Sequence, residues 1–244
     1  MSDWPRPSGR VVVTGVGAVT PLATGVERFW SRLLAGESGV DRISLMDPSD
    51  FSTQIAAEVK DFNAEDWLDR KEARRIDRFI AFAVASASMA LEDSGLKPEG
   101  ELANHVGVLI GSGIGGLTFL GEQIRRHCAG GPRRVTPFPL PHPNPDTAGG
   151  AGSTGADAIG VAYHTIKRGD AVAMVTGGTE APINEIGLAG FCSARAMTTN
   201  NDNPKTASRP FDAARDGFIM GEGSAVLILE DYDHAKARGA KIYG

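Results

Sequence analysis

The sequence has few of the residues on which several large classes of protein depend. Only two of its 244 residues are cysteine, Cys128 and Cys192, which excludes a disulfide-rich scaffold and a cysteine-based zinc site. No stretch reaches the ~18 apolar residues that a membrane span needs, and the first ten residues lack the apolar core of a signal peptide. We therefore expect a protein of the reducing cytoplasm that does not associate with a membrane.

Basic residues are also in the minority. The chain has 25 Lys and Arg against 30 Asp and Glu, a net charge of −5, whereas a protein that coats nucleic acid normally carries positive charge. We expect no nucleic-acid partner, and any basic function must be local. Hydrophobic residues make up 41% of the chain and charged residues 23%, which is typical of an ordered globular domain.

Glycine, by contrast, is abundant, with 31 residues, many of which directly follow short apolar runs. Runs at 11–14, 106–110, 172–176 and 225–229 predict four buried strands. Amphipathic segments between them indicate a layered α/β domain over residues 1–244. Two stretches with weaker periodicity are interpreted as surface or active-site insertions, at 36–70 and 178–224.

Three helices are predicted with defined ends. A capping box formed by Thr24 and Glu27 opens a helix that runs to about residue 34. A single apolar stripe predicts one long helix over 71–94, closed by Gly95. A third helix begins near Thr154 and ends before Gly169.

One glycine pattern could bind a nucleotide. Gly111, Gly113 and Gly116 follow a predicted strand in the order G-x-G-x-x-G, which lets backbone N–H groups approach a dinucleotide pyrophosphate. That fold also needs an acidic residue after a second strand about 20 positions later, where this sequence has Gly131-Pro132-Arg133-Arg134. Close packing of backbone layers is the favoured interpretation, and a nucleotide-dependent oxidoreductase is the remote alternative.

Basic residues are concentrated at two places. Lys71, Arg74 and Arg75 share one helix face through their i, i+3 and i+4 spacing, and Arg133 and Arg134 form a doublet in a loop. A solvated face would explain any one of these residues, but together they could dock an acidic partner.

The nucleophile and metal candidates are weak. The five histidines show no metal-ligand spacing, so we expect no metal site. Cys128, at a helix end, is a weak candidate for a nucleophile, and the apolar neighbours of Cys192 predict a buried structural thiol.

Six blocks of sequence together resemble one known family. The sequence is similar to the β-ketoacyl-acyl carrier protein synthases (3-oxoacyl-ACP synthases) of the type II, chain-elongating group. The resemblance implies a thiolase-like α/β fold with a mixed five-stranded sheet flanked by helices, and a homodimer. It also implies that the chain supplies the N-terminal half of a fold with two similar halves. The matching blocks are Val11-Val12-Val13-Thr14-Gly15-Val16-Gly17, Arg70-Lys71-Glu72, Gly111-Ser112-Gly113-Ile114-Gly115-Gly116, Gly131-Pro132-Arg133-Arg134, Gly177-Gly178-Thr179-Glu180-Ala181, and Ser208 to Gly223.

The resemblance implies an acyltransferase activity. Family members condense an acyl thioester with malonyl-acyl carrier protein in a decarboxylative Claisen reaction of fatty acid biosynthesis, without metal or redox cofactor. A cysteine at the start of a buried helix carries the acyl chain, and two histidines of the second half assist. Gly152 occupies the position of that cysteine, so we expect this chain to be inactive. The nearest hydroxyl, on Ser153, is expected to cap the helix together with Thr154.

Other positions match the family's binding residues. Ile114 and Phe138 match the acyl pocket, Phe138 on the segment that crosses to the neighbouring subunit. The surface that docks acyl carrier protein in the family is matched by Lys71, Arg74, Arg75, Arg133, Arg134 and Arg195. The alternative function is a non-catalytic subunit that binds acyl carrier protein or dimerises. Relative to the family pattern, the stretch 139–149 is short by about a strand and its turn. An isolated half is expected to expose an apolar sheet face and to aggregate or associate.

Overall fold

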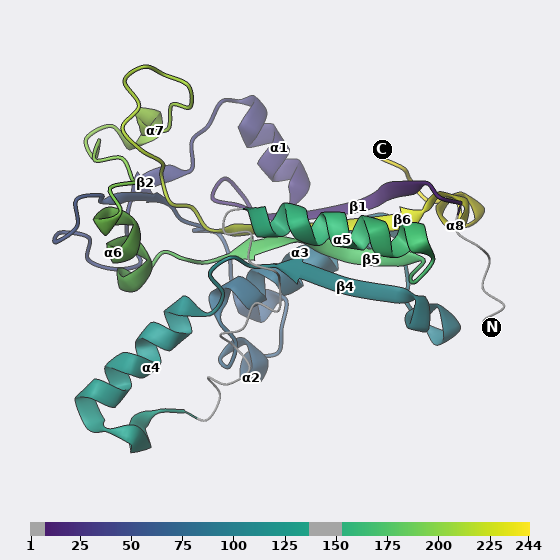
Figure 1. Ribbon diagram of the computed structural model, residues 1–244, viewed down its shortest axis with the longest axis horizontal. Helices are drawn as coiled ribbons and strands as arrows, with labels where there is room; N and C mark the ends of the chain where they lie inside the picture. The colour runs from purple at the N-terminus through teal and green to yellow at the C-terminus, as the bar shows by residue number, and fades with distance from the viewer. Residues whose placement is uncertain (1–7, 137–152) are drawn as a thin grey trace.

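The computed structural model describes residues 8–136 and 153–244 of the chain. Its centre is a mixed sheet in the order β1 (Val11–Val19), β6 (Gly223–Asp231), β5 (Ala173–Glu180), β4 (Val106–Gly111) (Figure 1). β6 runs antiparallel to both of its neighbours, whereas β4 and β5 are parallel. Because parallel neighbours need a crossover, a helix must connect β4 to β5, and α5 (Thr154–Arg168) occupies this place in the chain.

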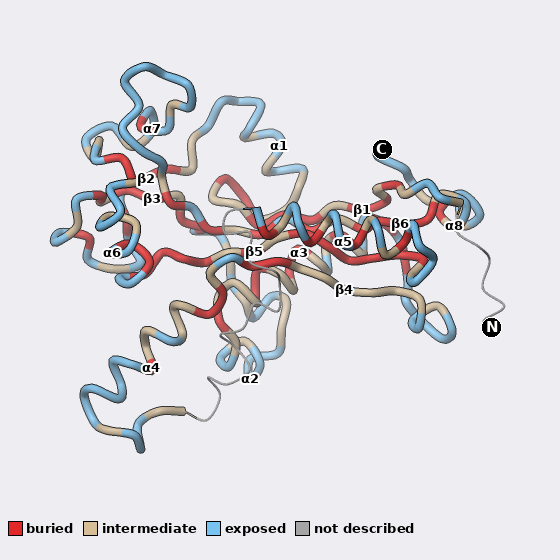
Figure 2. The backbone as a smooth tube through the Cα atoms, viewed as in Figure 1, coloured by how far each residue is buried: buried red, intermediate tan, exposed pale blue. Residues whose placement is uncertain are grey.

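Helices cover both faces of the sheet, with α5 on one face and α3 (Arg78–Ser94) on the other. α3 packs directly on the backbone of β1, because a Cβ atom at Gly15 or Gly17 would clash with carbonyl oxygens of α3. β1, β5 and β6 are largely buried, whereas the edge strand β4 is mostly half-buried (Figure 2). The expected exposure of an apolar sheet face is therefore confined to β4, where Val108 is 69% exposed.

The four strands predicted from apolar runs are all present, each with a longer range than predicted. The fold is the mixed α/β arrangement that the resemblance implies. The sheet contains four strands among the residues that the structure describes, where the resemblance implies five. The stretch 139–149, predicted to be short by about a strand, lies outside the described residues.

Two helix boundaries differ from prediction. The stretch 71–94 forms two helices, α2 (Arg70–Ala73) and α3, because the Asp77 carboxylate accepts a hydrogen bond from the Arg78 N–H (2.6 Å) and starts a new helix. α1 (Val26–Leu34) begins after Gly25, whose φ of 98° suits glycine, and no side chain caps it. The Thr24–Glu27 capping box is therefore wrong; Thr24 instead bonds to Asp61.

The two predicted insertions pack against each other beside the sheet. β2 (Val40–Arg42) and β3 (Ile55–Ala57) form a small antiparallel sheet, and α6 (Glu185–Ser193) and α7 (Pro204–Ala207) come from the second insertion. They share a core formed by Ile43, Ala56, Ile183, Leu188, Met197 and Met220. The remaining elements are η1 (Ala64–Asp66), η2 (Gly100–His105), α4 (Leu117–Gly130), η3 (Pro132–Arg134) and α8 (Tyr232–Ala237).

A buried ionic network fixes the end of β6. The Glu230 side chain has no solvent exposure and accepts hydrogen bonds from Arg238 (2.7 Å to each oxygen), from Thr14 (2.9 Å), and pairs with His234 (2.5 Å). Burial alone would raise the pKa of Glu230, but these donors outweigh it and lower the pKa from 4.5 to about 2. The network joins β1, β6 and the chain after α8.

In the described parts of the chain, no helix is long and apolar enough to cross a membrane.

Candidate functional site

A pocket lies where the ends of the strands meet the first turn of α5. Its volume is about 430 Å³. A Cβ atom at Gly111, the last residue of β4, would lie 2.5 Å from the Thr154 carbonyl oxygen, and one at Gly155 would lie 3.1 Å from the Cα of Gly178. These glycines therefore let the N-terminus of α5 reach the strand ends. The lining is Val19, Thr20, Pro21, Gly111, Gly113, Thr154, Gly155, Gly178, Thr179, Glu180, Gly221, Glu222, Gly223, Ser224 and Ala225.

The position predicted to match the family's nucleophile adjoins this pocket in sequence. Gly152 and Phe138 lie outside the described residues, and Thr154, two residues after Gly152, lines the pocket. The Ser153 hydroxyl is 3.1 Å from the Asp157 carboxylate and does not cap the helix. The predicted cap is therefore wrong. The Ser153 hydroxyl bonds to the carboxylate of Asp157, one turn further along α5, and does not accept a capping hydrogen bond from a backbone N–H of the helix. Ile114, the acyl-pocket candidate, is half-buried in the turn after β4.

Glu180 holds that turn in place. One of its carboxylate oxygens accepts hydrogen bonds from the Ser112 hydroxyl (2.6 Å), from the Ile114 N–H (3.2 Å) and from the Gly113 N–H. The second oxygen is buried and has no hydrogen-bond partner in the part of the chain that the structure describes. Glu180 was not predicted as a site residue, because it lies four residues beyond the predicted strand and the sequence shows none of its partners.

This carboxylate also explains the glycine pattern that could have bound a nucleotide. The N–H groups of Gly113 and Ile114, which a pyrophosphate would need, already bind Glu180. A negative charge in the turn repels phosphate. The spacing of Gly111, Gly113 and Gly116 therefore serves packing and a turn bound to Glu180.

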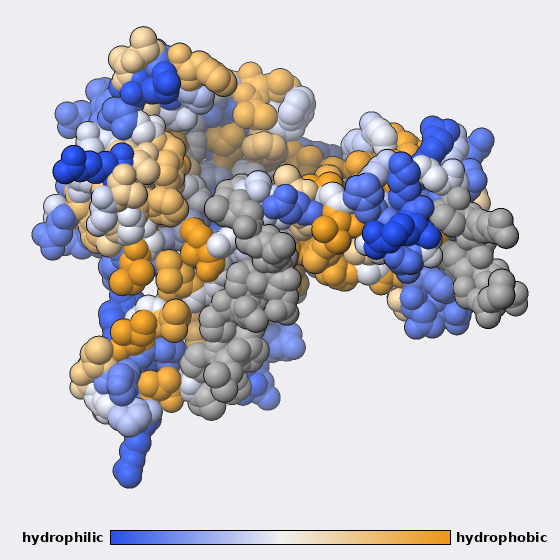
Figure 3. All heavy atoms as spheres, viewed as in Figure 1, coloured by the Kyte–Doolittle hydropathy of each residue, from blue (hydrophilic) through white to orange (hydrophobic). Residues whose placement is uncertain are grey.

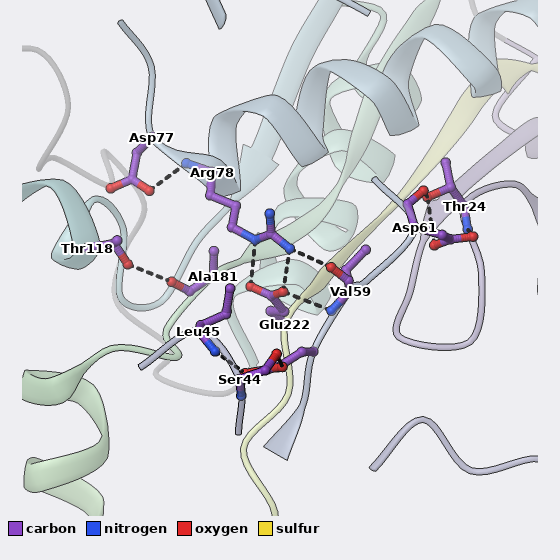
Figure 4. Close-up of polar contacts among 11 residues, drawn as sticks. Thr24, Ser44, Leu45, Val59, Asp61, Asp77, Arg78, Thr118, Ala181 and Glu222 are labelled. Carbon is purple, nitrogen blue, oxygen red and sulfur yellow. Dashed lines mark hydrogen bonds and ion pairs between the residues drawn. The ribbon is translucent and has the colours of Figure 1, made fainter. Parts of the chain in front are cut away.

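A second buried carboxylate ties the floor of the pocket to α3 (Figure 4). The Glu222 side chain is 1% exposed and accepts hydrogen bonds from Nε of Arg78 at 2.9 Å and from a terminal nitrogen of Arg78 at 2.7 Å. It also accepts the Val59 N–H at 2.8 Å, and Arg78 donates to the Val59 carbonyl at 2.6 Å. A bidentate pair of this kind is geometrically specific. The pair fixes the turn before β6. Sequence reasoning did not identify this pairing of Arg78 with Glu222.

The predicted basic residues are exposed and lie in three regions of the chain. The prediction that Lys71, Arg74 and Arg75 share one helix face is wrong, because α2 ends at Ala73 and Arg74 and Arg75 lie in the turn that follows. Lys71, Arg74 and Arg75 line one surface hollow with Arg70, which the sequence analysis had not selected as a binding residue. Arg133 and Arg134 are in η3, a 3-10 turn rather than an irregular loop, and Arg134 lines a hollow with Arg126. Arg195 follows α6 with φ 53°.

α4 connects these elements. The Phe119 N–H near its start donates to the Asp77 carboxylate, at the corner between α2 and α3 (2.9 Å). Arg125 of α4 forms an ion pair with Glu185 of α6 at 2.6 Å. η3 follows α4 directly in the chain. All three basic elements are therefore attached to the same helix.

The cysteines are distinct from the pocket. Cys128 is exposed on α4, and Cys192 is half-buried rather than fully buried as predicted. Burial raises the pKa of the Cys192 thiol, but hydrogen bonds from Ser52 and Thr53 lower it by more, so the pKa is below its ordinary value. Among residues 8–136 and 153–244, no three His, Cys, Asp or Glu side chains converge as metal ligands.

Comparison with known proteins identifies the family. The profile described as "Beta-ketoacyl synthase, N-terminal domain" matches residues 8–151 and 145–235, two segments that together cover most of the chain. The chain belongs to the β-ketoacyl synthase family. The 3-oxoacyl-acyl-carrier-protein synthase 2 of Staphylococcus aureus is 44% identical over 251 residues, and that of a Synechocystis species is 46% identical over 252. Each alignment covers 96% of this chain.

These relatives are longer than this chain, which spans 60% of the Staphylococcus protein and 61% of the Synechocystis protein. The aligned length of 251 residues also exceeds the 244 residues here, so the relative has insertions within the matched region.

Solved structures share the fold. A β-ketoacyl synthase from Burkholderia phymatum superposes with a TM-score of 0.81 at 33% identity, over 96% of this chain and 62% of its own. A complex of a type II PKS acyl-carrier protein with its ketosynthase, bound to the hexaketide, superposes with a TM-score of 0.82 at 29% identity, over 98% of this chain and 62% of the ketosynthase chain.

Proposed function

We propose that this chain binds acyl carrier protein on its basic face and forms no acyl thioester at the position where its relatives carry the nucleophile. We call the residues Lys71, Arg74, Arg75, Arg133, Arg134 and Arg195 the carrier face. The observation that supports carrier binding is the gathering of Arg70, Lys71, Arg74 and Arg75 around one hollow on a chain of net charge −5. Clustered cations on an acidic protein favour an acidic partner, and the attraction weakens with salt.

The reaction of the relatives supports the choice of partner. The related proteins are named as synthases of 3-oxoacyl-acyl carrier protein, and one related structure contains a ketosynthase with its acyl-carrier protein. Family members carry out decarboxylative condensation of an acyl thioester with malonyl-acyl carrier protein in fatty acid biosynthesis. In this chain the turn of Ile114, bound to Glu180, would form one wall of the acyl pocket. Phe138, which also matches the family's acyl pocket, lies outside the described residues.

The chemistry of Gly152 supports the loss of acyl transfer. Thioester formation requires a thiolate that attacks the acyl carbon while the carrier's thiol leaves, and glycine has no side-chain atom that can attack. Ser153 is adjacent, and its hydroxyl bonds to the Asp157 carboxylate. A carboxylate is a weak base for an alcohol hydroxyl.

Carrier binding is tested with holo-acyl carrier protein, titrated against the 244-residue chain by biolayer interferometry at several salt concentrations. We expect salt-sensitive binding that weakens at least about tenfold in Lys71→Glu/Arg74→Glu, since two charges reverse within one hollow. Arg168→Glu is the control, because Arg168 is exposed at the end of α5 and pairs with Asp170. Equal weakening in both variants would contradict a specific carrier face.

Acyl transfer is tested separately, with acyl carrier protein that bears a radiolabelled acyl chain. We expect no label on the wild-type chain after denaturing electrophoresis. Label on the wild-type chain that Ser153→Ala removes would overturn the proposal and assign a serine nucleophile.

A dimerising subunit is the second candidate. We also propose a homodimer, which is the assembly that the family resemblance implies. Light scattering at several protein concentrations tests it. A monomer at all concentrations contradicts the homodimer but leaves carrier binding intact.

A further inference from the structure

α4 buries little of its surface against the rest of the chain. Of its residues only Gln123 is buried, and two of its apolar residues, Leu120 and Ile124, are 37% and 52% exposed. The helix projects away from the sheet (Figure 1), and apolar atoms are exposed along this projecting part, at the lower left of Figure 3. With so little apolar burial, the direction of α4 depends on its polar contacts.

Among the described residues, polar contacts fasten α4 to the body of the chain at two places. In its first turn, the Thr118 hydroxyl donates to the Ala181 carbonyl (3.2 Å) and the Phe119 N–H donates to Asp77 (2.9 Å). The second place is the ion pair between Arg125 and Glu185, which lies about 10 Å further along the helix axis. A helix held at one end can pivot, whereas a second contact further along fixes its direction.

The carrier-face residues Arg133 and Arg134 follow the direction of α4. They lie in η3, and the Thr136 N–H just after η3 donates to the Gln123 side chain of α4 at 3.1 Å. The stem of Arg134 lies against Gly130, where a Cβ atom would be 2.7 Å from Cγ of Arg134. The end of α4 and η3 therefore form one unit.

The other partner of the ion pair belongs to the helix that carries Arg195. Glu185 is the first residue of α6, and Arg195 follows that helix directly, with its N–H bonded to the Cys192 carbonyl at 2.9 Å. The Arg125 guanidinium stabilises the Glu185 carboxylate and holds its pKa below the ordinary value. The ion pair thus joins the helix that carries the η3 arginines to the helix that carries Arg195.

We propose that the ion pair between Arg125 and Glu185 is a positioning contact of the carrier face, which fixes α4 on α6 and so sets the spacing between the η3 arginines and Arg195. This inference rests on the proposed function, because it concerns binding of the same carrier. The side chains of Arg125 and Glu185 are 59% and 48% exposed. An exposed pair contributes modestly, so we expect its loss to weaken carrier binding by about threefold.

The test compares Glu185→Gln with Glu122→Gln in titrations of the 244-residue chain with holo-acyl carrier protein. Each substitution removes one negative charge, and charge alone would strengthen the attraction of an acidic carrier in both variants. Glu122 pairs with Arg126 of the same helix, so Glu122→Gln should bind the carrier as tightly as the wild-type chain or more tightly. Glu185→Gln should instead bind about threefold more weakly, a direction that the change of net charge cannot produce.

Reversal of the pair provides the rescue. Arg125→Glu/Glu185→Arg leaves the net charge unchanged and restores an ion pair between the two helices, so it should bind the carrier within about twofold of the wild-type chain. Carrier binding by Glu185→Gln that equals or exceeds that of the wild-type chain would overturn the positioning role. A loss that the reversed pair does not repair would overturn it as well.

A second measurement does not require the carrier. A nitroxide label on Cys128, which is exposed on α4, reports the motion of this helix by electron paramagnetic resonance in a Cys192→Ser background. We expect a more mobile label in Glu185→Gln and an unchanged label in Glu122→Gln, and equal mobility in both would overturn the inference. If the wild-type chain does not bind the carrier, the proposed function fails, whereas the label still decides whether the pair fixes α4.

Discussion

Replacement of Arg238 by Leu tests the buried network at the end of β6 most directly. Arg238 donates from Nε and from a terminal nitrogen to the two oxygens of Glu230, both at 2.7 Å, and also to the Ser94 carbonyl at 2.9 Å. Leucine retains part of the apolar stem but removes the charge. Glu230, which has no solvent exposure, would then keep only Thr14 and His234 as donors.

The size of the effect follows from the pKa of Glu230. The network lowers that pKa from 4.5 to about 2, and each pKa unit corresponds to about 1.4 kcal/mol, so ionised Glu230 stabilises the folded chain by about 3 kcal/mol. This contribution is fully present above pH 4.5 and is lost as the pH falls towards 2. Removing one partner of a buried pair costs about 3–5 kcal/mol, because the remaining charge is uncompensated.

Urea unfolding at pH 7 and at several pH values between 4.5 and 2, monitored by circular dichroism, measures both quantities. We expect Arg238→Leu to lower the free energy of unfolding by about 3–5 kcal/mol at pH 7, and to flatten the acid dependence between pH 4.5 and 2. Arg168→Leu is the matched control, because Arg168 forms an exposed pair with Asp170 and should change stability by at most about 1 kcal/mol. Equal effects of the two substitutions would refute the reasoning.

Two further predictions concern glycine and the turn after β4. Gly17→Ala should lower the free energy of unfolding by more than about 2 kcal/mol, because its Cβ would clash with the Ser86 carbonyl. Gly160→Ala, on a helix with open space around the new Cβ, should be neutral or stabilising by up to about 1 kcal/mol. Thermal melts compare the two variants, and similar losses of stability would contradict the packing argument. Glu180→Ala leaves three donors of the turn without an acceptor, so it should lower the free energy of unfolding by about 1–3 kcal/mol and speed hydrogen exchange at residues 113–115. Glu180→Gln keeps an acceptor and should lower the stability less. Equal exchange rates in the two variants would count against the role of the carboxylate.

The strands could be predicted because each contains a continuous apolar run, although β4 is mostly half-buried rather than buried. β5 is buried along most of its length, and it includes residues 173–176 of the predicted 172–176 segment. The ends of α3 and α5 could also be predicted, since Gly95 and Gly169 adopt the left-handed conformation in which glycine has an advantage.

Interactions between distant residues could not be predicted. Glu180 and the turn it binds are 66 to 68 residues apart, and Glu222 is 144 residues from Arg78. Each of these carboxylates looks like an ordinary polar residue in the sequence, because nothing local shows that it is buried or which donors surround it. The break between α2 and α3 was missed for a similar reason, since Asp77 also accepts a hydrogen bond from Phe119, 42 residues away.

The parts of the candidate site differ in how they depend on the family's nucleophile. The pocket is formed by strand ends and by two carboxylates, and the carrier face is attached through α4, so neither uses a side chain at position 152. Under the proposed function, glycine at position 152 removes one chemical step and leaves the basic residues that we propose bind the carrier. The proposal therefore separates binding from bond formation, and carrier affinity and acyl labelling must be measured independently.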